Sequence, residues 1–169
     1  MVIEVREEQP SDVAAVRDLN DRAFGEPLEG RIVDALRSNG GAMLSLVAIR
    51  DGRVAGHVLF SPIDVGGLTG AALGPMAVLP EHQRIGIGSL LVNEGCRRLE
   101  ARGCPFIIVI GHPTYYPRFG FVPASRYGIS CEWKVPDEAF MILVLDPSSM
   151  TGVTGLARYR EEFGFGLEA

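Results

Sequence analysis

Apolar and polar residues alternate along the first forty residues in a pattern that predicts one strand followed by two helices. Val2 to Arg6 alternates and predicts a short strand. Apolar residues at helical spacing follow Pro10-Ser11-Asp12, which offers a cap, and continue to Gly25. A second helix is expected from near Pro27 to Asn39-Gly40-Gly41.

The next segment predicts three antiparallel strands. The runs SLVAIR and RVAGHVLFSPI flank Asp51-Gly52, a residue pair typical of tight hairpins. Gly66-Gly67 predicts another turn, and Ala71 to Leu79 is the third strand of the same sheet.

A long helix then joins two strands. It is expected from Ser89 to Arg102, with Leu90, Leu91 and Leu99 facing inward. The continuous apolar run from Pro105 to Ile110 is typical of a strand that is buried on both faces. A strand–helix–strand connection within one sheet makes the two strands parallel.

The remaining elements are shorter. A short helix is expected around Thr114 to Phe119, and strands near Phe121, near Ile129 and from Phe140 to Leu145. The last twenty residues fit either a strand or one helical turn, and the strand is favoured. The order of elements predicts an α+β fold with one mixed, mostly antiparallel sheet flanked by helices.

Composition indicates an ordinary globular chain. Of the 169 residues, 47% are hydrophobic and 22% are charged. No repeat or low-complexity segment divides the sequence, so we expect a single domain over residues 1–169. Residues 146–169 are then a C-terminal extension that packs on the same domain.

Charge and cysteine content narrow the function class. The 16 basic and 21 acidic residues give a net charge of −5, which is unfavourable for general nucleic-acid binding. Cys96, Cys104 and Cys131 are odd in number and lack the spacing of a disulfide framework or a zinc site. No apolar run is long enough to cross a membrane, and no secretory signal opens the chain. We therefore expect a cytoplasmic protein with no metal and no membrane partner.

The segment from Met76 to Ser89 carries the candidate chemistry. It leaves a strand, passes through a loop that contains Gly86 and Gly88, and opens the long helix. Unpaired N–H groups at a helix start, next to residues without a Cβ, favour the binding of phosphate. A plain glycine-containing helix entry would have the same pattern. The segment lacks the GK[ST] of a Walker A loop and the third glycine of a Rossmann fingerprint.

Two motifs resemble the GNAT superfamily of N-acetyltransferases. Gln83-Arg84-Ile85-Gly86-Ile87-Gly88 matches that family's pyrophosphate motif [QR]-x-x-G-x-[GA], and Val78-Leu79-Pro80 precedes it at the family's distance. Downstream, Tyr116-Pro117-Arg118-Phe119-Gly120-Phe121 looks like the family's Y-x-x-x-G-F. The order of elements agrees from Val2 to about Leu145, so the resemblance covers most of the chain.

The resemblance implies a GNAT-like fold that binds acetyl-CoA. The acyl-CoA cleft would lie between the Met76 strand and the Phe106 strand, a parallel pair that splays apart, with Pro75 at the break. In the family match, the Met76 N–H stabilises the oxyanion and Tyr116 protonates the departing thiolate. The implied coenzyme-binding residues are Met76, Ala77, Val78, Gln83, Arg84, Ile85, Gly86, Ile87, Gly88 and Ser89.

The general base stays open at this point. The strand AALGPMAV has no acidic residue, although some members of the family place a glutamate there. The candidates elsewhere are Glu26, Glu29, His57 and His112, and a water chain could replace any of them.

The resulting prediction is an acetyl-CoA-dependent N-acetyltransferase that acts on a primary amine by direct attack in a ternary complex. The acceptor is a small molecule or a protein amine, and the protein is a monomer or a homodimer. One alternative is an acetyl-CoA-binding sensor without turnover. Another is a nucleotide-phosphate binder that uses the same loop.

Overall fold

The computed structural model describes residues 2–164, which form two units that are each built from two stretches of chain. The first unit contains residues 2–61 and 74–95, and the second contains residues 62–73 and 96–164. Each unit is described below by itself. The single domain over residues 1–169 stays a prediction, and the last five residues of the expected extension lie outside the described residues.

Strands β1 (Ile3–Glu7), β2 (Leu44–Arg50) and β3 (Arg53–Val65) pair antiparallel in the order of the chain. The hairpin between β2 and β3 turns at Asp51 and Gly52, which both have positive φ values, 51° and 75°. Two successive residues in this region give the turn a twist that matches the strands. The hairpin predicted from the Asp51-Gly52 pair is therefore confirmed.

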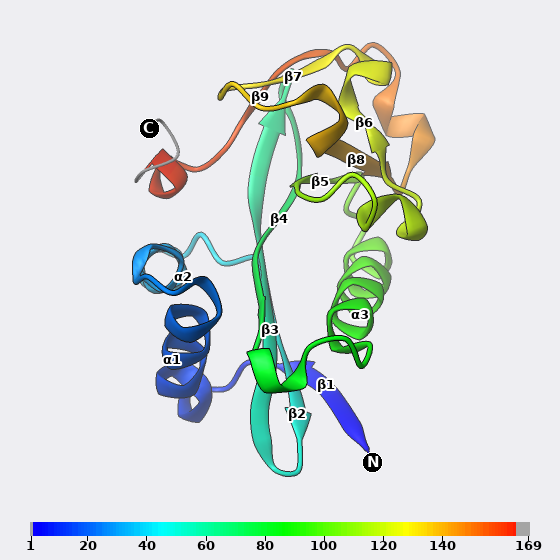
Figure 1. Ribbon diagram of the computed structural model, residues 1–169. Helices are drawn as coiled ribbons and strands as arrows, with labels where there is room; N and C mark the ends of the chain where they lie inside the picture. The colour runs from blue at the N-terminus through cyan, green and yellow to red at the C-terminus, as the bar shows by residue number, and fades with distance from the viewer. Residues whose placement is uncertain (1, 165–169) are drawn as a thin grey trace. The chain divides into compact units, whose positions relative to one another are not determined.

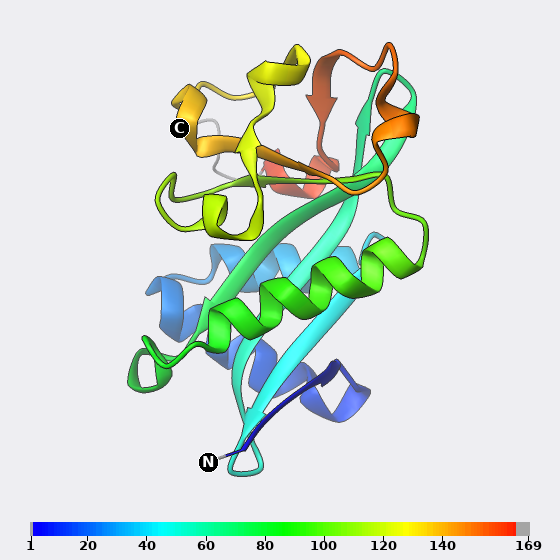
Figure 2. The ribbon, with the colours of Figure 1, turned by 90° about the vertical axis from the view of Figure 1, so that its right-hand side faces the viewer.

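Helices cover both faces of these strands in the first unit. Helices α1 (Val13–Phe24) and α2 (Leu28–Ser38) lie on one side, and α3 (Ile87–Ala101) begins on the other (Figures 1 and 2). Gly95 of α3 lies directly over the ring of Phe60, because a Cβ built there would overlap that ring. A helix can approach a sheet this closely only where the side chain is missing.

The second unit holds the parallel pair. Strand β4 (Leu68–Val78) pairs with β5 (Phe106–Ile110), from Ala71 opposite Ile107 to Leu73 opposite Val109. The crossover through α3 was predicted to make these strands parallel, and this is confirmed. Pro75, which has no N–H to donate, follows shortly after the last of these pairs. The splaying of the two strands stays a prediction.

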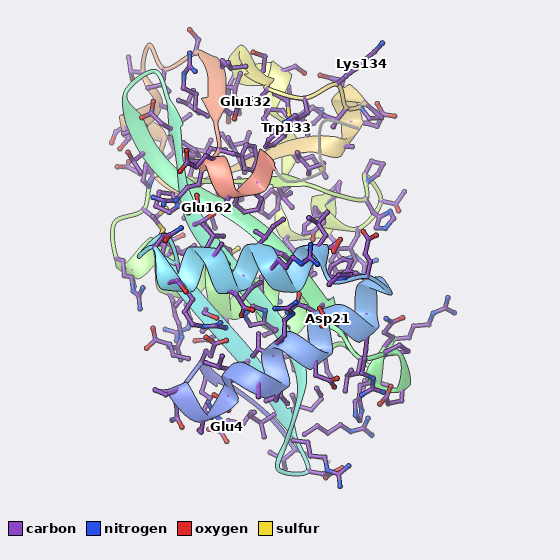
Figure 3. The ribbon with its side chains drawn as sticks, turned by 90° about the vertical axis from the view of Figure 1, so that its left-hand side faces the viewer. Glu4, Asp21, Glu132, Trp133, Lys134 and Glu162 are labelled. Atoms are coloured by element: carbon purple, nitrogen blue, oxygen red, sulfur yellow. The ribbon has the colours of Figure 1, made fainter. Side chains whose placement is uncertain are left out.

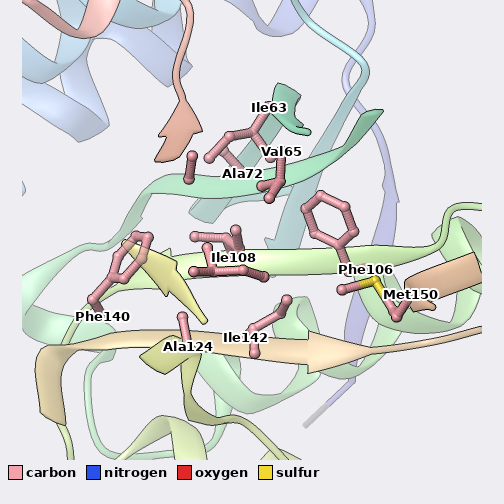
Figure 4. Close-up of a cluster of buried hydrophobic side chains, with 11 residues drawn as sticks. Ile63, Val65, Ala72, Phe106, Ile108, Ala124, Phe140, Ile142 and Met150 are labelled. Atoms are coloured by element: carbon pink, nitrogen blue, oxygen red, sulfur yellow. The ribbon is translucent and has the colours of Figure 1, made fainter. Parts of the chain in front are cut away.

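A hydrophobic cluster stabilises the second unit (Figure 4). The ring of Phe106 is fully buried in it and lies where a Cβ at Gly70 would come within 2.5 Å. Buried side chains of β3, β5 and β8 (Phe140–Val144) meet here, and we expect each large one to contribute roughly 1.5–3 kcal/mol. The cluster consists of Ile63, Val65, Ala72, Phe106, Ile108, Ala124, Ile129, Phe140, Ile142, Met150 and Ala157.

The remaining elements are short. The strands are β6 (Val122–Pro123), β7 (Ile129–Cys131) and β9 (Gly155–Arg158). Single 3-10 turns span Pro10–Asp12, Pro80–His82, Tyr116–Phe119, Ala124–Tyr127, Asp137–Ala139, Pro147–Met150 and Glu161–Gly164. Strand neighbours follow the order β1-β2-β3-β4-β5-β8-β6, while β9 pairs with β3 and β7. The mixed, mostly antiparallel sheet of an α+β fold is confirmed.

Three local expectations need adjustment. Leu91 and Leu99 are buried as predicted, but Leu90 is 42% exposed. Successive helical residues point about 100° apart, so Leu90 and Leu91 cannot both face the same sheet. The helix expected around residues 114–119 is a single 3-10 turn. The C-terminal segment contains both alternatives, a strand at Gly155–Arg158 and a turn at Glu161–Gly164.

Candidate active site

The loop between β4 and α3 is shaped by backbone conformation. Residues Gln83 to Gly86 are exposed, and the buried side chain of Ile87 begins the helix. Arg84 has a φ of 65° and Gly86 a φ of 92°. A Cβ added at Gly86 would meet no atom within 4 Å, so open space lies beside the backbone at this point. Turns of this kind direct consecutive N–H groups outward and form concave anion sites.

The start of α3 adds to this anion-binding character. The Leu90 N–H donates to the Gly86 carbonyl at 3.0 Å and closes the first helical turn. The N–H groups of Ile87, Gly88 and Ser89 precede that bond and have no acceptor within the helix. The partial positive charge of the helix N-terminus favours a phosphate at the same position. The loop therefore fits the pyrophosphate that the sequence motif predicts.

Side chains from two other elements hold the 3-10 turn that leads into this loop. Arg22 of α1 forms an ion pair with Glu81 at 3.1 Å. Arg50, the last residue of β2, donates to the Nδ1 atom of His82 at 2.7 Å. The order of elements could not predict either contact, because each joins residues more than thirty positions apart.

Successive side chains at the end of β4 point to opposite faces of the strand. Ala77 is buried against Leu19 of α1, whereas Met76 and Val78 are half-buried. The Gln83 side chain donates to the Val78 carbonyl at 3.0 Å. A carbonyl has two lone pairs, so this bond leaves the Val78 oxygen one further acceptor position.

Tyr116 lies in the second unit and is 7% exposed. Its ring meets those of Tyr115 and Phe121 edge to face, with centroids 5.1 and 5.6 Å away. Gly111 makes room for it, because a Cβ there would overlap the Tyr116 ring. Burial, with a smaller effect of Tyr115, raises the pKa of the Tyr116 phenol well above its usual value of about 10. The hydroxyl therefore keeps its proton at neutral pH.

The four candidate bases differ in their surroundings. His57 is fully buried, with Nε2 2.8 Å from the Ser45 hydroxyl and Nδ1 3.4 Å from the Asn20 amide nitrogen. Burial lowers the pKa of His57 to about 3, so the imidazole is neutral and a poor proton acceptor. Glu26 and His112 are exposed.

Glu29 has a different environment. Its Oε2 atom is buried and has no hydrogen-bond partner in the part of the chain that the structure describes. Burial raises the pKa of the Glu29 carboxyl, a hydrogen bond from its own backbone N–H partly offsets this, and the nearby charges of Glu26 and Asp21 raise the pKa further. A carboxylate whose proton affinity is increased in this way is suited to accept a proton.

The cysteine thiols within residues 2–164 are not activated. The three cysteines are free, and burial raises the pKa of each thiol, to about 12 for Cys96. Such thiols are poor nucleophiles. No group of three metal-ligating side chains occurs among these residues, and none of their helices is long and apolar enough to cross a membrane.

The two units divide the predicted site residues. Met76 to Ser89 lie in the first unit, together with Glu26, Glu29 and His57. Tyr116 and His112 lie in the second. Sequence reasoning missed Arg22 and Arg50, which bind the 3-10 turn that precedes the loop between β4 and α3.

Comparison with known proteins decides the family. A sequence model of the acetyltransferase (GNAT) family matches residues 13–121, more than half of the chain. The chain belongs to the GNAT family. The family and the acyltransferase class that the two motifs predicted are thus confirmed.

Relatives of this GNAT protein match along nearly the whole chain. The uncharacterized N-acetyltransferase YhbS of Escherichia coli K12 is 36% identical over 162 residues, covering 94% of this chain and 97% of YhbS. The uncharacterized N-acetyltransferase YjhQ of the same strain is 35% identical over 154 residues, covering 84% and 85%.

Solved structures confirm the GNAT fold. The crystal structure of E. coli YhbS in complex with CoA has a TM-score of 0.93 at 37% identity, covering 98% of this chain and 94% of that one. A GNAT acetyltransferase from Brucella melitensis in complex with acetyl-CoA has a TM-score of 0.79 at 35% identity, with coverages of 96% and 98%.

Proposed function

We propose that this GNAT protein binds acetyl-CoA and transfers the acetyl group to a primary amine by direct attack in a ternary complex. The observation that carries this proposal is the loop at Arg84 to Gly86, with its positive φ values, its open space and the adjacent helix start. Coenzyme A bound to YhbS and acetyl-CoA bound to the Brucella protein support the same ligand class.

The coenzyme would be held mainly by backbone groups. The N–H groups from Arg84 to Ser89 would bind the pyrophosphate. The half-buried edge at Met76 and Val78 would pair with the amides of the pantetheine arm, as an added strand pairs with a sheet edge. Ala77 would hold this edge in place through its contact with Leu19.

The acetyl transfer would need three groups. A base takes a proton from the ammonium, so that the nitrogen lone pair can attack the thioester carbon. The Met76 N–H donates to the oxygen that becomes negative. Tyr116 gives its proton to the sulfur as the carbon–sulfur bond breaks. The roles of Met76 and Tyr116 rest on the family match of their motifs, and the protonated state of Tyr116 agrees with its role.

Substitution of Gly86 tests the proposed phosphate site. We expect Gly86→Val to weaken coenzyme A binding on the order of hundredfold, because the added side chain fills the space that the phosphate would occupy and disturbs one or two charge-assisted hydrogen bonds. Isothermal titration calorimetry with coenzyme A and with ATP measures this directly. Tighter binding of ATP than of coenzyme A would instead identify a nucleotide-phosphate binder.

Gly40→Val is the matched control. Gly40 lies in the same unit, has a φ of 69° and also has open space at its Cβ position. Both substitutions cost about 1–2 kcal/mol of backbone strain, but only the change at Gly86 should affect coenzyme binding. Equal affinities in the two variants would place the phosphates elsewhere. Thiol release from acetyl-CoA across a panel of primary amines then distinguishes an enzyme from a sensor.

A further inference from the structure

The acidic residues on α1, α2 and the segments next to them are almost all matched by arginines. Figure 3 looks onto this pair of helices and labels Asp21, whose carboxylate contacts the Arg17 guanidinium at 3.1 Å. The other ion pairs of this region join Arg6 with Asp12, Arg22 with Asp18, Arg17 with Asp34, Arg37 with Asp34 and Arg37 with Glu8.

Two carboxylates at the start of α2 differ from this pattern. Within residues 2–164, neither Glu26 nor Glu29 forms an ion pair with a basic side chain. The Oε2 atom of Glu29 is also buried without a donor. Buried acceptors are nearly always paired, so this atom is open to a donor from outside the chain, either water or a bound ligand.

Packing explains why Glu29 is desolvated. Gly30, the next residue, contacts α1 so closely that a Cβ there would come within 2.6 Å of the Arg17 and Asp21 side chains. The start of α2 is therefore pressed onto α1, and the Glu29 carboxylate is held near that of Asp21. Arg17 already pairs with Asp21, so the unmatched charges at this turn are those of Glu29 and Glu26, and they favour a positively charged, proton-donating partner.

The same turn belongs to the unit that contains the end of β4. Leu19 packs on Ala77 and Leu79, and Ala23 of α1 joins that cluster. The turn that carries Glu26 starts two residues after Ala23. In addition, the Arg22–Glu81 ion pair fastens this end of α1 to the 3-10 turn that precedes the phosphate loop. The unmatched carboxylates thus follow directly on the helix end that packs against β4.

We propose that Glu29 is the general base of the acetyl transfer and that Glu29 and Glu26 together bind the ammonium group of a cationic amine acceptor. This inference rests on the proposed function. The ammonium gives one proton to the Glu29 Oε2 atom, and the freed nitrogen lone pair forms the bond to the thioester carbon. The attacking nitrogen then loses a second proton while the sulfur leaves with one from Tyr116. Tyr116 recovers a proton from the nitrogen, and Glu29 returns its proton to solvent.

Glu29→Gln tests this assignment. The variant keeps the size of the side chain but cannot take a proton, so we expect kcat to fall on the order of hundredfold. The wild-type enzyme should lose activity as the pH falls, because Glu29 must be ionised, and its raised pKa places this loss above the usual range of a glutamate. This acidic limb should vanish in the variant. Glu29→Asp should restore part of kcat, and Glu26→Gln should raise KM for the amine with little change in kcat.

The assay uses the full chain, acetyl-CoA and whichever amine of the panel the wild type acetylates fastest. Glu4→Gln is the matched control, since Glu4 is an exposed carboxylate of the same unit on β1. Coenzyme A affinity, measured by calorimetry, should be the same in all of these variants. Thermal unfolding shows whether each variant folds.

Two outcomes would overturn the role of Glu29, and a third would overturn the proposed function as well. Glu29→Gln activity within threefold of wild type would overturn the role of Glu29 while the proposed function stands. A loss of coenzyme affinity that matches the loss of activity would also overturn it, because Glu29 would then support the coenzyme site. A wild-type enzyme that acetylates no amine would overturn the proposed function and this inference together.

Discussion

Two buried candidates for proton transfer, His57 in the first unit and Tyr116 in the second, differ in what burial does to their chemistry. Burial favours the neutral form of both side chains. For an imidazole, this removes the ability to accept a proton at neutral pH. For a phenol, it keeps the proton on the oxygen at neutral pH, while it also makes the phenol a weaker acid toward a departing thiolate. Burial alone does not identify a catalytic residue, and the direction of its effect has to match the step.

The side chains that surround His57 and Tyr116 also differ. His57 has polar neighbours at both ring nitrogens, and Glu8 lies 3.8 Å from its Nε2 atom. Tyr116 has aromatic neighbours, Tyr115, Phe119 and Phe121, that contact its ring. The polar group around His57 is typical of a structural network, whereas the aromatic group positions the Tyr116 ring and desolvates its hydroxyl.

The largest expected effect is the loss of kcat in the variant Tyr116→Phe. Removing the hydroxyl removes the proposed proton donor, so kcat should fall on the order of hundredfold or more. The ring and its aromatic contacts stay, so we expect a small change in the free energy of unfolding. Because the pKa of Tyr116 is raised, the wild-type rate should show no alkaline loss from this group below about pH 10. Steady-state kinetics across pH, with thermal unfolding of both proteins, measures these effects.

A second prediction concerns the stability of the folded protein at acidic pH, to which His57 contributes. Its pKa is about 3 in the folded protein, against about 6.5 in the unfolded chain. Between these values the unfolded state binds the extra proton, so the free energy of unfolding should decrease by about 1.4 kcal/mol for each unit of pH below 6.5. Above that pH the contribution is complete.

The variant His57→Gln isolates the contribution of His57 to the pH dependence of stability. The amide cannot titrate, so the difference in stability between variant and wild type should shift in favour of the variant as the pH falls. Urea unfolding at several pH values gives this difference. The kcat of the variant at neutral pH should stay near that of wild type, and a hundredfold loss would restore His57 as a candidate base.

A smaller effect on kcat than that of Tyr116→Phe is expected for Gly111→Ala. The added Cβ overlaps the Tyr116 ring, so the ring or the strand end must shift, and we expect a cost of about 1–3 kcal/mol in stability. The displaced phenol should also lower kcat, by less than its removal does. Gly164→Ala is a suitable control in the same unit, since a Cβ there meets nothing within 4 Å. Unchanged kinetics in Gly111→Ala would show that the position of Tyr116 is not critical.

Local patterns in the sequence predicted most of the fold. The Asp51-Gly52 pair, the helix end at Gly25 and the apolar run that ends at Ile110 each determine structure through neighbouring residues. The loop before α3 was also expected from its glycines, and Gly86 does adopt a positive φ there. The binding of phosphate by this loop stays a prediction. The exposed face of Leu90 was not, since it depends on which turn of α3 meets the sheet.

The choice among the four bases required the structure. The sequence presents Glu29 and His57 as equivalent polar residues in amphipathic segments. Their proton affinities depend on contacts between distant parts of the chain, such as Asn20 with His57 and Asp21 with Glu29. Some ion pairs made by the arginines of α1 and α2 lie within one helix, but Arg17–Asp34, Arg22–Glu81 and Arg37–Glu8 join different elements. The sequence alone therefore could not show which carboxylates stay unmatched.

The way the chain is threaded through its two units has a consequence for protein engineering. The polypeptide passes from one unit to the other after Ser61, after Leu73 and after Gly95. No single cut in the gene can therefore release either unit as one continuous fragment, and a shortened clone would leave β3 or β4 without part of its own length. Designs that aim to isolate the first unit, which contains the proposed phosphate loop, need a new order of segments, with residues 2–61 joined to 74–95 by a new linker.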